Sequence, residues 1–220
     1  MVGLLLLCWA FCQLPAETKF SNIYRLNLWF SRVSRSGDGS TLENTAVIRG
    51  VLLELLPRQT NFLDVPCGDF HWMREVRARL PGFDTKYVGM DVVPSIISAN
   101  SRAFPTVTFK QGDAGTTQEQ YDLILMRDLL QHLCTAKQMR ILNNLRASGS
   151  SLLLVNYEPD VQQNRTVHAD PAPDWFPFNL ELPPFSLRPL QTFASDGKDK
   201  HYGLFELKSL PPLHSGPADS

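Results

Sequence analysis

The chain has 220 residues, with 21 Lys or Arg, 22 Asp or Glu, a formal net charge of −1 and 43% hydrophobic residues. This length and balance are typical of one globular domain and exclude a disordered chain, a collagen-like chain and a coiled coil. The near-neutral charge argues against a nucleic-acid partner, which would require a basic face. The four cysteines lack zinc-site spacing and are too few for a disulfide framework.

Residues 1–16 contain no charged side chain, and residues 1–12 are all apolar or small. This run is shorter than the roughly 20 residues that span a bilayer, but it has the length of a signal-peptide core, with Ala16 before a possible cleavage point. We predict a hydrophobic leader over residues 1–16, either a signal peptide or a membrane anchor. The alternatives are a buried N-terminal helix or a misplaced start codon.

The leader would direct the chain to the secretory pathway or to a membrane, and without it the chain would be cytoplasmic. One glycosylation triplet, at Asn164, fits the secretory route. Such triplets also arise by chance, so this one adds little to the prediction.

Residues 17–208, the predicted main domain, alternate between helical and extended patterns. Ser40 and Thr41 follow a Gly-Asp-Gly turn and are predicted to cap the first helix, and Thr135 is predicted to cap a later one. In chain order we predict a helix over 41–57, a strand from 61, a helix over 70–80, a strand over 86–92, a helix from Pro94, strands over 106–113 and 121–128, a helix over 135–148 and a strand over 151–157.

The remainder is a long proline-rich loop over 157–188, two strands within 189–210 and a tail over 209–220 that we predict to be disordered. Strands that alternate with helices imply an α/β fold with a mainly parallel sheet and helices on both faces. The near-continuous apolar runs over 123–126 and 152–155 are typical of strands buried on both sides.

Aspartates follow four of the predicted parallel strands, at Asp64, Asp91, Asp113 and Asp128. Each alone could be a loop residue or a helix cap, but ligands of an open parallel sheet bind beyond the carboxyl ends of its strands. No glycine-rich phosphate-binding fingerprint is present, which disfavours a nicotinamide oxidoreductase. Carboxylates accept hydrogen bonds from ribose hydroxyls and an adenine amine, so the pattern favours the cationic nucleoside S-adenosyl-L-methionine (SAM).

The motifs FLDVPCGDFHWM, YVGMDVVPSII, FKQGDA and YDLILMRDLLQHL resemble the class I SAM-dependent methyltransferases. Within them the chain is most similar to a little-characterised family with a D-V-P-C-G-D-F-x-W-M first motif and an R-D-x-L-x-H-L fourth-strand motif. The similarity covers residues 20–207, including the early SRSGDGST and the late NLELPPF. It implies a Rossmann-like class I methyltransferase fold with a mainly parallel seven-stranded sheet.

The resemblance also implies roles for individual residues on the cofactor side. Asp91 would accept hydrogen bonds from the ribose hydroxyls, and Asp113 with the Ala114 backbone would contact the adenine. Asp64 and Gly68 would shape the turn on the methionine side, where Asp69 would hold the SAM amino group.

Candidates for acceptor chemistry gather after the fourth strand. Asp128 and His132 are four residues apart and would share a face if this segment is helical, so that one could orient the other as general base. The alternative is that Asp128 caps a helix and His132 is a core residue. Residues predicted to contact the acceptor are Arg127 and, in the proline-rich loop, Trp175, Phe178 and Asn179.

The predicted function is methyl transfer from SAM to an unidentified acceptor, a hydroxyl or amine of a small molecule or glycan. The alternative is a non-catalytic protein of the secretory pathway or membrane that uses the same fold for binding or as a scaffold. We predict no metal site, because Val155 stands where a third acidic ligand would be useful. Neither a nucleic acid nor an obligate protein partner is expected.

Overall fold

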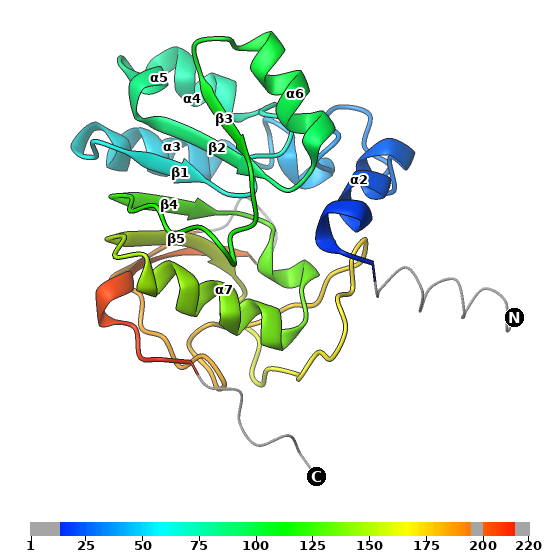
Figure 1. Ribbon diagram of the computed structural model, residues 1–220. Coiled ribbons are helices and arrows are strands. Elements are labelled where there is room, and N and C mark those ends of the chain that lie inside the picture. The colour runs from blue at the N-terminus through cyan, green and yellow to red at the C-terminus, as the bar shows by residue number, and fades with distance from the viewer. Residues whose placement is uncertain (1–13, 195–199, 214–220) are drawn as a thin grey trace, which may run out of the picture.

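The computed structural model of the chain describes residues 14–194 and 200–213. Within these residues a seven-stranded sheet runs in the order β3-β2-β1-β4-β5-β7-β6 (Figure 1). Its strands are β1 (Phe62–Asp64), β2 (Tyr87–Asp91), β3 (Thr108–Gln111), β4 (Leu123–Met126), β5 (Leu152–Tyr157), β6 (Gln191–Phe193) and β7 (His201–Glu206). Strands β1 to β5 pair in parallel, and β7 pairs antiparallel with β5 and β6. The predicted fold class is confirmed.

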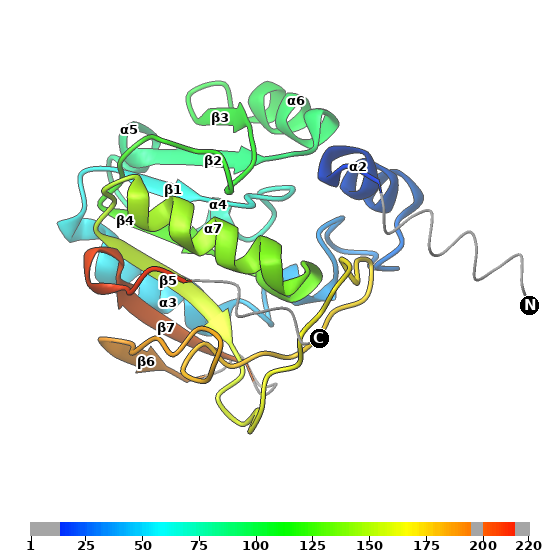
Figure 2. The same cartoon turned by 60° about the horizontal axis from the view of Figure 1, so that its bottom comes forward.

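Helices cover both faces of the sheet (Figure 2). One face carries α2 (Ala16–Leu26), α6 (Pro94–Ala103) and α7 (Thr135–Ala147), and the other carries α3 (Ala46–Leu55), α4 (Met73–Arg79) and α5 (Phe83–Lys86). Successive strand residues point to opposite faces of the sheet. Leu63 packs in the hydrophobic cluster with α2 and α7, whereas Phe62 packs in the cluster with α3 and α4. The central strands are therefore buried on both sides, as their apolar runs predicted.

The two predicted caps are wrong in detail. Residues Asp38–Ser40 form a short 3-10 helix, and α3 begins only at Ala46. Thr41 Oγ1 instead accepts a hydrogen bond from the Asn44 N–H, which closes a local turn before the helix. Thr135 is the first residue of α7, and its Oγ1 accepts from the Val167 N–H. A long-range contact to the proline-rich loop takes the place of a local cap.

Helix α2 was not among the predicted elements. It buries Phe20, Ile23 and Tyr24, whose spacing of three and four residues forms one apolar face, and it ends at Asn27 in a left-handed conformation. The predicted leader lies outside the described residues except for 14–16, and Ala16 is already the first residue of this helix. No helix among the described residues is long and apolar enough to cross a membrane.

The loop between β5 and β6 folds back on the domain and passes below α2 and beside one end of α7 (Figures 1 and 2). It contributes Leu180, Phe185 and Leu187 to the core. The predicted disordered tail begins too early, because Leu210 and Leu213 are buried and the Asn143 side chain bonds to both backbone groups of Leu213. Residues 214–220 lie outside the described residues.

Candidate functional site

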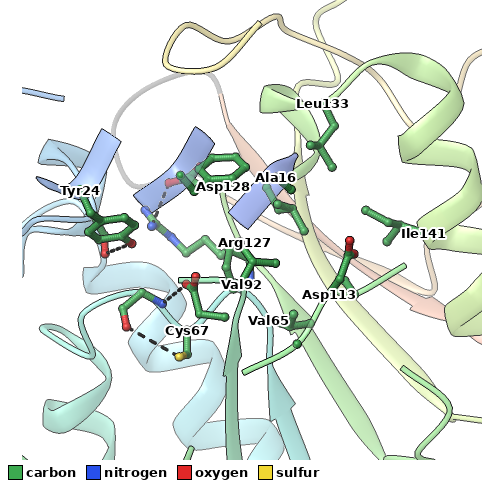
Figure 3. A pocket seen from close by; sticks show the side chains of 18 of the residues that line it. Ala16, Tyr24, Val65, Cys67, Val92, Asp113, Arg127, Asp128, Leu133 and Ile141 are labelled. Atoms are coloured by element: carbon green, nitrogen blue, oxygen red, sulfur yellow. Dashed lines mark hydrogen bonds and ion pairs between the residues drawn. The ribbon is translucent and has the colours of Figure 1, made fainter. Parts of the chain in front are cut away.

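A cavity of about 210 Å³ opens at the carboxyl ends of the parallel strands. Its floor comes from the turns after β1, β2 and β4, and α2 and α7 close over it from the other side. Figure 3 shows Tyr24 of α2 and Asp128 on one side, with Leu133 and Ile141 on the other. Ligands of open α/β sheets bind at this edge, so the cavity is the candidate site.

The turn after β1 is built around Gly68, which has a φ of +53°. A Cβ at this position would lie 2.3 Å from Ser36 Oγ, so the turn requires glycine. The Gly68 N–H donates to Asp91 Oδ2 (3.1 Å), and the Gly68 carbonyl accepts from the Asn100 side chain (2.8 Å). Beside it Cys67 is buried, and burial raises the pKa of its thiol, which makes it unreactive.

Asp91, at the end of β2, lines the cavity although the residue is only 3% exposed. Its Oδ1 accepts from the Val93 N–H (3.0 Å) and its Oδ2 from Gly68, and no ion pair to it exists among residues 14–194 and 200–213. Burial raises the pKa of this carboxyl to about 6, against the lowering effect of the backbone hydrogen bonds. At neutral pH the site therefore holds a buried negative charge without a cation partner.

Asp113 and Ala114, after β3, form the far wall of the cavity. The Gly115 N–H fixes Asp113 Oδ1 (2.7 Å), and Asp113 Oδ2 lies 3.7 Å from the Arg140 guanidinium on α7. Two of the residues expected to contact a cofactor thus share a wall, and α7 supplies a cation beside them.

Asp64 does not line the cavity. Its side chain points to the opposite face of the sheet, where the Tyr87 hydroxyl donates to Oδ2 (2.8 Å). Burial raises the pKa of Asp64 to about 7, against the lowering effect of the Tyr87 hydrogen bond and, to a smaller extent, of Arg127. Any effect of Asp64 on a ligand is therefore indirect, through the backbone of the turn.

Asp69 lines the cavity, but its carboxylate is already engaged. It accepts from the Ser34 hydroxyl, the Arg35 N–H (2.7 Å), the Ser36 hydroxyl and the His71 N–H. These contacts tie the first motif to the segment 34–36, which precedes it by more than thirty residues in sequence. In this structure Asp69 holds the N-terminal loop over the turn.

The end of β4 carries a cluster of charges around Asp128. Arg127 Nη1 lies 2.9 Å from Asp128 Oδ2, and Lys200 Nζ lies 2.8 Å from Oδ1. Gln131 and Asn156 also donate to Oδ1. Burial by itself raises the pKa of this carboxyl. The two cations and the hydrogen bonds lower it by more, so the net pKa is well below its usual value. Asp128 stays ionised and is a weak proton acceptor.

Arg127 itself is nearly buried and bridges several segments. Its Nη2 donates to the Gly39 carbonyl (2.6 Å), its Nε donates to the Tyr202 hydroxyl (3.0 Å), and its guanidinium lies 5.7 Å from the centre of the Trp72 ring. Gly39 is packed so closely that a Cβ there would lie 3.0 Å from Asp128 Oδ2. The cluster joins the early loop, β4 and β7 into one unit.

The helix expected to carry both Asp128 and His132 does not form. Asp128 has a φ of +53°, and only Leu130–His132 make a short 3-10 helix. His132 does not line the cavity: its Nδ1 donates to the Asp174 carbonyl (2.7 Å), and its ring packs against Trp29, which does line it. Burial lowers the pKa of His132, so the imidazole is neutral at neutral pH, with Nε2 lacking a hydrogen-bond partner in the described part of the chain.

The three residues of the proline-rich loop lie outside the cavity wall. Phe178 is buried against Phe185, whereas Trp175 is 51% exposed and lies below Lys200, 5.9 Å from its Nζ. Asn179 donates to the carbonyls of Pro159 and Val161 and so fixes the loop.

The Asn164 side chain is occupied by the same loop. Its Nδ2 donates to the carbonyls of Asn179 and Pro183, both at 2.8 Å, and its Oδ1 accepts from the Asn179 N–H. A glycan on Nδ2 would remove at least one of these bonds. Glycosylation at this position stays a prediction, and the structure gives Asn164 a role inside the loop.

The residues of α2, of the segment after it and of α7 that cover the cavity, here called its roof, were not predicted from the sequence. Phe20, Tyr24 and Trp29 supply an apolar wall, and Lys137 and Arg140 of α7 supply cations. The apolar spacing over residues 16–26 was a usable signal for the helix that carries the first two. Nothing local indicated that Trp29 Nε1 donates to the Pro173 carbonyl (3.1 Å), a contact across 144 positions. No three His, Cys, Asp or Glu side chains of the described chain are grouped to hold a metal ion.

Comparisons with known proteins agree with this fold. Residues 62–148 match the family model of a methyltransferase domain. The structure is similar to magnesium protoporphyrin IX methyltransferase from Synechocystis with bound SAM, at 13% identity and a TM-score of 0.61, covering 88% of this chain and 96% of that one. It is also similar to human N-acetylserotonin methyltransferase in complex with SAM, at 17% identity and a TM-score of 0.57, covering 88% and 60%. No curated protein matches the chain. The chain has the fold of the class I methyltransferases.

Proposed function

We propose that this protein is a SAM-dependent methyltransferase. The observation that carries the proposal is Asp91, a buried carboxylate that faces the cavity from the end of β2 with no cation beside it. A buried charge is costly unless a partner compensates it, so the site favours a ligand that brings hydrogen-bond donors and positive charge. The match of residues 62–148 to a methyltransferase domain supports the same assignment.

The residues around Asp91 fit an adenosine with a cationic sulfonium. A carboxylate offers about four acceptor positions, and backbone N–H groups do not use all of those on Asp91, so it can still accept from ribose hydroxyls. Asp113 presents a further acceptor for an exocyclic amine. Val92, Ala114 and Ile141 provide apolar surface for a flat base between the sheet and α7.

Bound SAM supplies an electrophilic methyl group on a good leaving group, so the protein mainly has to position the acceptor. Phe20, Tyr24, Trp29 and Leu133 form a wall that suits an acceptor with an apolar body and a reactive hydroxyl or amine. We propose a small molecule of this kind before a glycan, because this wall is apolar.

His132 is the proposed general base. It does not line the cavity itself but packs against Trp29, which does; its neutral imidazole, with Nδ1 bonded to the Asp174 carbonyl, would leave Nε2 to accept a proton from an acceptor that reaches it. Asp128, held ionised by two cations, is proposed as a positioning residue that fixes Arg127 and Lys200.

Calorimetry with SAM and S-adenosylhomocysteine tests the cofactor assignment. Asp91→Asn should weaken SAM binding by about 10- to 100-fold, because charge-assisted hydrogen bonds contribute about 1.5–3 kcal/mol each. Glu54→Gln is the matched control, since it removes an exposed carboxylate on the outer side of α3 and should leave affinity unchanged. Equal affinities in wild type and Asp91→Asn, with both folded, would contradict the proposal.

The alternative of a non-catalytic SAM-binding protein keeps one observation in its favour. Asp128, the acid nearest the predicted acceptor position, is fully engaged in ion pairs. Wild-type protein that binds SAM tightly but labels no member of a panel of phenols, amines and sugars with radioactive methyl groups would favour this alternative.

A further inference from the structure

Residues 25–35, the segment after α2, expose an unusual amount of apolar surface. Leu26 is 57% exposed, Phe30 81% and Val33 58%. Single exposed hydrophobic residues are common on soluble proteins. Three within eight positions are instead typical of a surface that binds a partner or a membrane. Trp175 and Phe176, also exposed, are brought near this segment by the bond from Trp29 to the Pro173 carbonyl.

The backbone holds these side chains outward. Asn27 and Phe30 both have positive φ values, which is uncommon for a bulky residue such as Phe, and the Phe30 N–H donates to the Asn27 carbonyl (2.8 Å). The neighbouring Trp29 turns inward and packs against Phe20 and Tyr24. Phe30 is therefore presented on an anchored turn.

The same segment is basic. Arg25, Arg32 and Arg35 are exposed, and no Asp or Glu occurs between Glu17 and Asp38. The one other cation of this stretch, Lys19, is buried against Asp170. The acids that approach from other elements are Asp69, whose carboxylate accepts from the Arg35 backbone, and Asp174, next to the exposed Trp175.

We propose that residues 25–35 bind the surface of anionic lipid bilayers, with Leu26, Phe30 and Val33 inserted at the interface and the three arginines on the lipid headgroups. Protein segments that bind anionic membrane surfaces typically combine exposed apolar side chains, which insert among the lipids, with basic side chains, which contact the headgroups. A second copy of this chain would bring the same positive charge and is disfavoured as the occupant.

Membrane binding by residues 25–35 does not depend on the proposed catalysis, but it would fix where the cavity lies. Trp29 belongs to the segment and also lines the cavity. Binding through residues 25–35 therefore places the cavity at the membrane surface.

Co-sedimentation of the full chain with phosphatidylcholine vesicles, with and without phosphatidylserine, tests the proposal. The combined variant Leu26→Ser, Phe30→Ser and Val33→Ser should lower the bound fraction at least about tenfold, because it removes most of the inserted apolar area. Leu190→Ser is the matched control, since Leu190 is 62% exposed before β6 and lies outside the segment. All these proteins share residues 1–13, so a difference between them reports on residues 25–35.

A second arm tests the charge. Arg32→Ser with Arg35→Ser should reduce binding to phosphatidylserine vesicles about tenfold or more, and added salt should weaken wild-type binding. The proposal is overturned if the apolar variant sediments as wild type does, or if wild type binds neutral and anionic vesicles equally. It is also overturned if wild type binds no vesicle, whether or not it binds an acidic protein such as a polyglutamate-tagged carrier.

Discussion

Asp91 and Asp128 follow neighbouring parts of one sheet edge but lie in opposite electrostatic surroundings. Asp91 is held by backbone N–H groups alone, whereas Asp128 lies between Arg127 and Lys200. The first carboxylate keeps a charge that a ligand can compensate, and the second has been compensated by the protein. A strand-end aspartate therefore indicates a position, and its partners decide what it can do there.

The part of the site around Gly68 and Asp91, proposed to bind the cofactor (the cofactor half), and the part around Asp128 and His132, proposed to bind the acceptor (the acceptor half), also differ in how they are assembled. Gly68 and Asp91 meet over one strand–helix–strand unit, 23 residues apart. The acceptor half depends on contacts between distant parts of the chain, such as Lys200 with Asp128 across 72 positions and Lys19 with Asp170 across 151. The contact between Gly68 and Asp91 is a local product of the parallel sheet, whereas these long-range ion pairs form only when distant segments of the chain dock on it.

The largest expected effect is on turnover in the acceptor half. His132→Gln should lower kcat by about 10²–10⁴ while SAM affinity stays nearly constant, because a general base contributes that much. The measurement needs a verified acceptor. Unchanged turnover in this variant would leave His132 as a core residue that packs on Trp29.

Asp128→Asn sharpens the same comparison. The negative charge of Asp128 raises the pKa of His132, so its removal should move the acidic limb of the pH–rate profile to lower pH. A merely structural Asp128 would lower activity without moving this limb.

The next largest effect concerns the docking of the roof. Asp170 accepts from Lys19, Lys137 and the Cys134 N–H, and both it and Lys19 are buried. Asp170→Asn should reduce the free energy of unfolding by about 3–5 kcal/mol, because breaking a buried ion pair leaves a charge uncompensated. Urea denaturation measures this.

Glu75→Gln is the control for Asp170. It removes an exposed pair with Arg74 at 3.9 Å and should cost no more than about 1 kcal/mol. If the two variants cost the same, the long-range ion pair does not hold the acceptor half together.

A smaller effect is expected at the turn of the cofactor half. Gly68→Ala forces a left-handed conformation on a residue with a side chain, costs about 1–2 kcal/mol, and pushes Ser36 away from the turn. SAM affinity should fall with it. Gly50→Ala, where a Cβ would meet nothing within 4 Å in α3, should instead stabilise the protein by about 0.5–1 kcal/mol.

The smallest effect is on pH dependence: stability and SAM affinity are expected to change with pH in opposite directions. The pKa values of Asp64 and Asp91 are raised to about 7 and about 6, so the folded state holds protons that the unfolded state has released. The contribution of these groups to stability is therefore present below about pH 4 and is lost as pH rises to about 7. SAM affinity should change in the other direction, and fall by up to about tenfold per unit below pH 6 as Asp91 is protonated.

Calorimetry and thermal denaturation at about pH 5 and about pH 8 separate the two trends. In Asp91→Asn the affinity for SAM should lose most of its pH dependence. If wild-type SAM affinity is flat across this range, the carboxylate of Asp91 does not carry the binding.

Much of the fold followed from local patterns. The apolar runs of β4 and β5 and the alternation of strands with helices predicted the parallel sheet, because buried strands need apolar residues on both faces. The strand-end positions of Gly68, Asp91, Asp113 and Asp128 followed from the same pattern. Caps were harder: Thr41 and Thr135 had the right chemistry, but a nearby turn and the distant Val167 took their hydroxyls.

The sequence alone determined the sheet, the edge at which a ligand binds and the residues that end each strand, since these depend on periodicity and on short connections. Only the tertiary structure decided that Asp64 faces away from the cavity, that Asp69 is saturated by residues 34–36 and that Asp128 is paired with Lys200. Their protonation and availability depend on burial and on charges brought from far along the chain. A carboxylate looks the same in a sequence whether its partner is a backbone N–H, a cation or a ligand.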